Sequence, residues 1–145
     1  MKKLTLGLLL CWVALQGMAD ELVWQTDLPK AQEQAKKEGK MVLMDFTGSD
    51  WCPWCIKLHN EVFSKPEFND YAKKNLVLVI VDFPHKKEQS SGLKKSNLAL
   101  QEKYKIQGYP TVVVLSSKGK KVGELGYEEG GPSHFIAGLD KLPKS

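Results

Sequence analysis

Two short apolar runs in the middle of the chain constrain its fold more than any other feature. Residues 76–81 (Leu-Val-Leu-Val-Ile-Val) are apolar without interruption, and residues 41–46 are apolar except for Asp45. Runs this short and this rich in β-branched residues favour strands that are covered on both faces. A sheet covered in this way needs helices on each side. The two runs therefore predict an α/β fold with a central sheet between two helical layers.

Strand and helix signals alternate around these two runs. Further strands are expected at 22–24, 112–115 and 121–125, and helices at 28–38, 54–63, 97–104 and 132–142, with one more helix after Ser64. The resulting order is β-α-β-α-(α)-β-α-β-β-α. The chain contains no internal repeat and no low-complexity tract, so this order predicts a single domain.

Local signals set several of the expected helix ends. Asp27 is a suitable N-cap for the first helix, and Gly39 is a suitable residue to end it. Ser64 and Glu67 match the spacing of a capping box at the start of the next helix. The polar stretch 82–96 predicts a solvated loop, with a binding element as the alternative.

The N-terminal residues have the layout of a targeting segment. Lys2 and Lys3 precede an uncharged apolar stretch, and the small residues of 17–19 follow it. This pattern is typical of a cleavable secretory signal peptide. An uncleaved anchor is the alternative, but the stretch is shorter than the ~20 residues that a spanning helix needs. We therefore expect a signal peptide at 1–19, a mature domain at 20–145, and a periplasmic location.

The basic residues argue against a nucleic-acid partner. The formal net charge is +4, and it falls to +2 when Lys2 and Lys3 leave with the signal peptide. Every basic residue other than histidine is a lysine. Proteins that read nucleic acids rely on the two-pronged hydrogen bonding of arginine, which this sequence lacks.

The cysteines indicate chemistry rather than structural cross-linking. Removal of the signal peptide takes away Cys11 and leaves only Cys52 and Cys55. A bridge between residues three apart closes a very small loop, so it stabilises the fold little. Thiol–disulfide exchange needs an attacking thiolate and a second thiol that releases the mixed intermediate. The pair at C-x-x-C spacing meets both needs.

The two cysteines are expected to have different roles. Cys52 would lie at a helix N-terminus, where free backbone N–H groups favour negative charge. Such a place can lower a thiol pKa from ~8.5 to ~3.5–7.5. We therefore predict that Cys52 is the nucleophile and that the more buried Cys55 resolves the intermediate.

Two other uses of a cysteine pair are weaker. A structural zinc site would need a second pair of ligands at a suitable spacing, and the three histidines are scattered. Haem attachment would need a histidine directly after the second cysteine, where this chain has Ile56. His59, one turn after Cys55, is expected to be a surface or packing residue. The sequence implies neither a metal nor a cofactor.

The residues around the cysteines resemble the thioredoxin superfamily. The resemblance rests on Asp45-Phe46, on Trp51 to Cys55, and on the segment from Gly108 to Thr111. The stretch from Gly48 to Cys55 is similar to that of exported bacterial proteins of the DsbH type and of the C-terminal domain of DsbD. The resemblance spans about 22–142 and implies a thioredoxin-like fold with a mixed sheet.

The resemblance also implies roles for single residues. Pro110 would be a cis-proline beside the dithiol, whereas composition alone favours an ordinary trans bond. Tyr109 and Pro110 would pair with an extended substrate strand. Asp45 would be a buried acid with a raised pKa that accepts the Cys55 proton through water. A satisfied polar residue at a strand end is the alternative for Asp45.

The residues next to the cysteines bear on substrate binding and on the direction of electron transfer. Trp51 and Trp54 are expected to form an apolar lip for substrate, with core packing as the alternative, above all for Trp51. Pro53 and Trp54 stand between the cysteines, where residues tune the redox potential. No arginine or histidine adjoins Cys52 to stabilise its thiolate, and Asp45 and Asp50 would oppose it. These features favour a reductase of protein disulfides.

The partners expected from this function are exported proteins with disulfides and a membrane electron donor of the DsbD type. The chain is expected to be a monomer. An oxidase or isomerase stays open as an alternative within the same chemistry. A thioredoxin-like binding module or chaperone without turnover is the alternative from another class.

Overall fold

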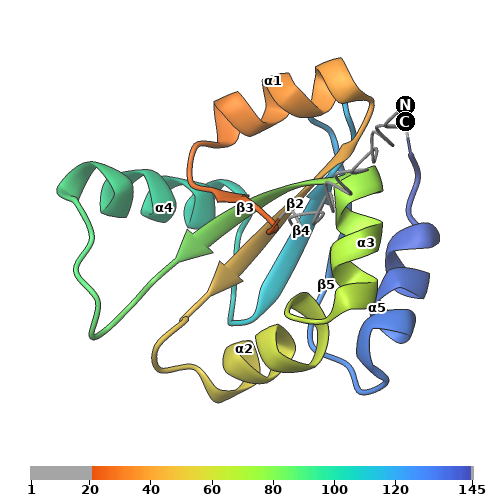
Figure 1. The fold of residues 1–145 in the computed structure, drawn as a ribbon. Coiled ribbons are helices and arrows are strands. Elements are labelled where there is room, and N and C mark those ends of the chain that lie inside the picture. Colours follow the sequence, from red (N-terminus) through yellow and green to blue (C-terminus); the bar gives the residue numbers. More distant parts are fainter. Residues whose placement is uncertain (1–20, 145) are drawn as a thin grey trace, which may run out of the picture.

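A five-stranded mixed sheet forms the centre of the computed structural model, which describes residues 21–144. The strands lie in the order β1-β3-β2-β4-β5 (Figure 1). β3 is parallel to β1 and β2, whereas β4 is antiparallel to β2 and β5. The strand bounds are β1 Trp24–Gln25, β2 Met41–Thr47, β3 Leu76–Asp82, β4 Thr111–Leu115 and β5 Lys121–Leu125.

Helices cover both faces of this sheet, as predicted. α1 and α4 lie on one side, and α2, α3 and α5 lie on the other (Figure 1). A π-helical turn, η1, continues α2. The bounds are α1 Leu28–Glu38, α2 Pro53–Leu58, η1 His59–Phe63, α3 Pro66–Asn75, α4 Ser91–Lys103 and α5 Gly131–Asp140. The predicted order of elements and the thioredoxin-like α/β architecture are confirmed.

The two apolar runs are the two central strands, β2 and β3. Alternate side chains point to opposite faces, so each strand supplies both core layers. Leu43 and Leu78 pack under the α2, α3 and α5 side, whereas Val42 and Val79 pack under α1. Because both layers need apolar residues, the strands show no polar alternation. Asp45 is the exception among residues 41–46.

The capping signals of α1 are confirmed. The Asp27 side chain accepts a hydrogen bond from the Lys30 backbone N–H at 3.1 Å. Gly39 has a left-handed backbone with φ 67°, which a residue without a Cβ adopts most readily. α1 therefore begins and ends where the sequence predicts.

Three local predictions are wrong in detail. Lys65 rather than Ser64 is the N-cap of α3, and the Ser64 hydroxyl donates to the Asn60 carbonyl, so no capping box forms. The predicted helix 54–63 changes at His59 into the π-helical η1. α4 begins at Ser91, inside the stretch predicted as loop, because the Ser90 hydroxyl accepts the Leu93 N–H. Most of α4 is exposed, so its apolar spacing is too weak to mark its start.

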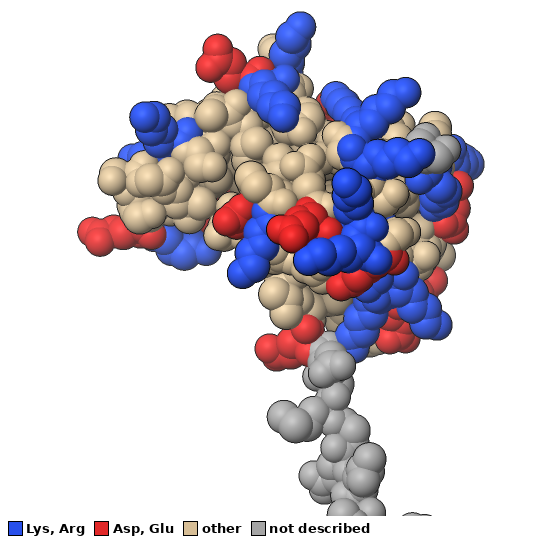
Figure 2. Space-filling view, turned by 90° about the horizontal axis from the view of Figure 1, so that it is seen from above, with Lys and Arg blue, Asp and Glu red and all other residues tan. Residues whose placement is uncertain are grey.

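The surface carries lysines beside carboxylates rather than a field of one sign. Figure 2 shows this mixture on the face seen from above. Lys37 pairs with Glu33 at 3.0 Å, and Lys40 pairs with Glu38 at 2.7 Å. Exposed pairs of this kind contribute little to stability.

The predicted signal peptide at 1–19 lies outside the described residues. Among residues 21–144, no helix has both the length and the apolar character required to cross a membrane.

Candidate active site

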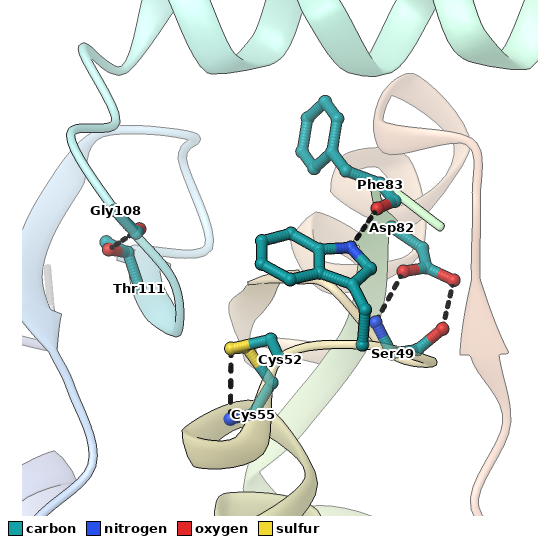
Figure 3. The surroundings of a disulfide bond; sticks show 8 residues. Ser49, Cys52, Cys55, Asp82, Phe83, Gly108 and Thr111 are labelled. Carbon is teal, nitrogen blue, oxygen red and sulfur yellow. Dashed lines mark hydrogen bonds between the residues drawn. A yellow bond between two sulfur atoms is a disulfide. The ribbon is translucent and has the colours of Figure 1, made fainter. Parts of the chain in front are cut away.

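The two cysteines lie at the start of α2, just beyond the end of β2. They form a disulfide, with their Cα atoms 5.2 Å apart. Cys52 is the N-cap of α2, and its Sγ accepts the backbone N–H of Cys55 at 3.3 Å (Figure 3). Pro53 fills the first helical position, where a missing N–H costs nothing. The Cys52 sulfur therefore lies where a helix N-terminus favours negative charge.

The expected difference in burial between the cysteines is not found in the disulfide form. Cys52 is 5% exposed and Cys55 is 4% exposed. Both cysteines are therefore buried in the disulfide form.

Trp51 joins the cysteine loop to the segment that follows β3. Its indole Nε1 donates to the Phe83 carbonyl at 2.7 Å. Its ring stacks on the His85 ring at a centroid distance of 4.3 Å and meets Tyr109 edge-on. Gly48 lies so close to the indole that a side chain there would collide with it. Trp51 is 36% exposed, so it is not an ordinary core residue.

Asp50 fixes the same segment by hydrogen bonds. Its carboxylate accepts the backbone N–H groups of His85, Lys86 and Lys87 at 2.8–2.9 Å. These bonds, led by that of His85, lower the pKa of Asp50 to about 2. The carboxylate therefore faces the 85–87 backbone. Sequence reasoning had linked Asp50 only to the thiols, because no local signal connects residues this far apart in the chain.

Asp82, at the end of β3, is a site residue that the sequence analysis missed. Its carboxylate accepts the Ser49 backbone N–H at 3.0 Å and the Ser49 hydroxyl at 2.5 Å (Figure 3). Lys87 Nζ lies 3.8 Å from the same carboxylate. The sequence analysis did not identify Asp82 because this residue directly follows the apolar run 76–81 and was assigned to the polar stretch 82–96.

Asp45 is the buried acid of the site. It is 7% exposed, and its Oδ1 has no hydrogen-bond partner among the described residues. Burial, followed by the charge of Asp82, raises the pKa of Asp45 to about 7. Its β2 position puts its side chain on the sheet face that α2 covers. The raised pKa is the property that the predicted acid needs, and the role of Asp45 in proton transfer stays a prediction.

The segment before β4 completes the surroundings of the disulfide. The Tyr109–Pro110 peptide bond is cis, as the resemblance implies. The Tyr109 hydroxyl donates to Gln101 Oε1 at 2.9 Å, and its ring stacks on Phe83 at 5.2 Å. The Thr111 hydroxyl donates to the Gly108 carbonyl at 2.7 Å (Figure 3). These contacts hold the segment against both the sheet and α4.

An open groove lined by aromatic and acidic side chains runs beside Trp54 and Pro110. It has a volume of about 420 Å³. The side chain of Trp54 is 56% exposed and meets the Tyr127 ring at a centroid distance of 5.4 Å. The groove is lined by Trp54, Tyr109, Pro110, Tyr127, Glu128 and Glu129. Tyr127 and both glutamates were not predicted, since they follow β5 far from the cysteines in sequence.

The arrangement supports two-electron thiol–disulfide chemistry. It combines a disulfide at a helix N-terminus, a buried carboxyl whose pKa lies near neutrality, and an open groove. His59 is exposed, as expected of a surface residue. Within residues 21–144 there is no cluster of three or more histidine, cysteine or acidic residues that could hold a metal ion.

Comparison with known proteins identifies the family. The profile of the family described as a thioredoxin-like domain matches residues 28–142. The chain is 35% identical over 119 residues to the disulfide bond reductase DsbH of Chlamydia pneumoniae, covering 82% of this chain and 71% of DsbH. It is 32% identical to the thioredoxin-related protein DsbJ of the same organism, covering 77% of this chain but only 33% of DsbJ.

Solved structures agree with this assignment. The structure of a DsbH oxidoreductase matches with a TM-score of 0.78 at 34% identity, covering 84% of each chain. The oxidised C-terminal domain of Neisseria meningitidis DsbD has the same fold, with a TM-score of 0.60 at 22% identity over 83% of this chain and 100% of that domain. The chain belongs to the thioredoxin-like domain family, among the disulfide oxidoreductases similar to DsbH.

Proposed function

We propose that this protein reduces disulfides of exported proteins in the periplasm. The observation that carries the proposal is the Cys52–Cys55 disulfide at the N-terminus of α2, beside an open groove. The disulfide marks the oxidised form of the enzyme, and the dithiol would be the working reductant. The reductase named DsbH, 35% identical to this chain, supports the same direction.

The reaction would run in two exchanges. The Cys52 thiolate attacks one sulfur of the substrate disulfide, the substrate S–S bond breaks, and its other sulfur leaves with the electron pair and takes up a proton. The Cys55 thiol then loses its proton and attacks Cys52 Sγ. The substrate sulfur leaves as a thiol, and the enzyme ends as the Cys52–Cys55 disulfide. Two electrons pass from the enzyme to the substrate.

Asp45 would take the proton that Cys55 releases. A carboxyl with a pKa near 7 can both accept and return a proton at neutral pH, which an ordinary aspartate cannot do well. Asp45 Oδ1 has no hydrogen-bond partner among the described residues, so it can accept a hydrogen bond from a water molecule. A bridging water would carry the proton between Cys55 and Asp45.

The charges around the site favour a reductant over an oxidant. In strong oxidants of this kind the reduced form is stabilised, because the protein stabilises a cysteine thiolate. Among the described residues, the one hydrogen bond to Cys52 Sγ comes from the Cys55 N–H, and Asp82 supplies negative charge on the sheet, joined by Asp45 whenever Asp45 ionises. These carboxylates would oppose a thiolate at Cys52. Pro53 and Trp54 would tune the potential further.

Substrate binding is proposed for four aromatic or proline residues. Trp54, Tyr109 and Pro110 line the groove, whereas Trp51 does not line it but meets the Tyr109 ring edge-on. An extended substrate segment would pair with the backbone of the Tyr109–Pro110 segment.

Location and partners follow from the N-terminus and from the relatives. Export by a signal peptide at 1–19 would leave the mature domain 20–145 in the periplasm. A membrane donor of the DsbD type would reduce the disulfide after each turnover. The protein would act as a monomer.

The equilibrium potential of the Cys52–Cys55 couple against glutathione tests the direction. A value near about −270 mV is expected for a reductant of the thioredoxin kind. A value near about −120 mV would contradict the proposal and identify an oxidant.

A further inference from the structure

Aromatic and acidic side chains both line the groove beside Trp54. We call the neighbouring rings of Trp54 and Tyr127 the floor, and the carboxylates of Glu128 and Glu129 the rim. Both glutamates are exposed. The groove thus offers apolar contact and negative charge to whatever segment enters it.

Lys57, whose ammonium group lies over the floor, is already engaged. Lys57 Nζ lies 5.2 Å from the Trp54 ring and 5.1 Å from the Tyr127 ring. The same ammonium is 3.9 Å from a Glu61 oxygen, and the Tyr127 hydroxyl donates to Glu61 at 2.6 Å. Lys57 is therefore engaged mainly by Glu61 and the ring faces, and its charge reaches Glu129 only through a weaker attraction without an ion pair.

The two rim carboxylates differ in their partners. Glu128 Oε2 contacts His134 Nε2 at 2.6 Å. Glu129 takes part in none of the ion pairs formed by residues 21–144. A ligand cation would gain most at Glu129, because there it displaces no existing partner.

We propose that this groove selects substrate segments that carry lysine or arginine close to the reacting cysteine. The inference rests on the proposed reductase function and adds the charge of the substrate to it. The alkyl stem of such a side chain would lie along Trp54, and its cationic end would meet Glu128 and Glu129. An acidic segment would meet like charge at the same place.

The test compares two peptides under single-turnover conditions. Each peptide carries an intramolecular disulfide and differs only in having lysine or glutamate beside one cysteine. The reduced full-length mature protein is mixed with each, and the rate constant of peptide reduction is measured at low and at high salt. The lysine peptide should react about two- to tenfold faster at low salt, as one or two exposed ion pairs allow. High salt should reduce this ratio.

Substitutions of the rim glutamates test whether these residues cause the difference in rate between the two peptides. Glu129→Gln should lower the rate ratio, and the double variant Glu128→Gln/Glu129→Gln should bring it close to one. Glu124→Gln is the matched control, since Glu124 is an exposed β5 carboxylate paired with Lys121 outside the groove. That control should keep the wild-type ratio. Circular dichroism of each variant checks that its fold is intact.

Two results would overturn the inference. Equal rates for both peptides with the wild-type protein, or a ratio unchanged in the double variant, would exclude charge selection by this rim while leaving the reductase function in place. Failure of the reduced protein to react with either peptide would contradict the proposed function itself, and the inference with it.

Discussion

Asp45 and Asp82 lie on the same face of the sheet, on adjacent parallel strands and two residues apart in register. Asp45 is opposite Ile80, and Asp82 is opposite Thr47. The Asp82 carboxylate is held by Ser49 and lies near Lys87, whereas Asp45 is buried with an unpartnered oxygen. The charge of Asp82 therefore adds to burial in raising the pKa of Asp45.

The charge of Asp82 is predicted to help keep Asp45 protonated. In Asp82→Asn the pKa of Asp45 should fall below about 7, by roughly one unit or less. It should stay above the ordinary value, because burial is the larger cause. Carboxyl NMR titration of the oxidised protein measures this directly. Asp70→Asn, an exposed change on α3, serves as the control, and an Asp45 pKa equal to that of the wild type would refute the coupling.

The buried acid is also predicted to make stability depend on pH. Because the pKa of Asp45 is raised, the folded protein binds more protons than the unfolded chain between about pH 4 and pH 7. The contribution of Asp45 to stability is therefore lost as pH rises through about 7. The free energy of unfolding of Asp45→Asn, relative to that of the wild type, should rise by a few kcal/mol between pH 4 and pH 8. Urea unfolding with the disulfide intact measures this difference, which would be independent of pH if Asp45 ionised normally.

Asp50 is predicted to hold the segment after β3 against the cysteine loop. Asp50→Ala removes the acceptor of three backbone N–H groups, so hydrogen exchange at residues 85–87 should quicken by roughly an order of magnitude. Glu88→Ala, a loss of charge in the same segment, should leave these amides unchanged. Equal exchange in the wild type and Asp50→Ala would show that the segment is held by other contacts.

The same carboxylate has the opposite pH dependence to Asp45. Its pKa is lowered to about 2, so its stabilising effect is present above the ordinary aspartate range and is lost as pH falls through about 2. The stability difference between wild type and Asp50→Ala should accordingly shrink below pH 4.

Asn97 is predicted to dock α4 onto the end of β3. It is 1% exposed, and its Nδ2 donates to the Asp82 carbonyl at 3.0 Å. Gln89 donates to the same carbonyl, so Asn97→Ala should cost only about 1–2 kcal/mol of unfolding free energy. Leu98→Ala, at a 53% exposed neighbour, is the control in urea unfolding. No loss in Asn97→Ala beyond that of the control would refute the docking role.

The sequence predicted the sheet well because its signals are local. The uninterrupted runs of β2 and β3 could be recognised without tertiary contacts, and so could the Asp27 and Gly39 ends of α1. α4 was placed too late because its surface is largely polar and its start depends on the Ser90 hydroxyl. Ser64 failed as a cap because its hydroxyl found a carbonyl within the preceding helix.

The site was predictable where its residues are close in sequence or match the family motif. Cys52, Cys55 and the cis bond at Pro110 fall in this group. Asp82 and Tyr127 were missed because their places depend on how distant segments meet. The charge of Asp82 beside the buried Asp45, and the acidic rim of the groove, could be found only from the fold.

Reduction of insulin by the wild type and the single-cysteine variants tests the central claim most directly. With dithiothreitol as the electron source, the wild type should reduce insulin, and Cys52→Ser should be inactive. Cys55→Ser should not turn over and should instead accumulate a mixed disulfide between Cys52 and the insulin chain. Full activity in Cys52→Ser, or a mixed disulfide trapped on Cys55 instead, would contradict the account.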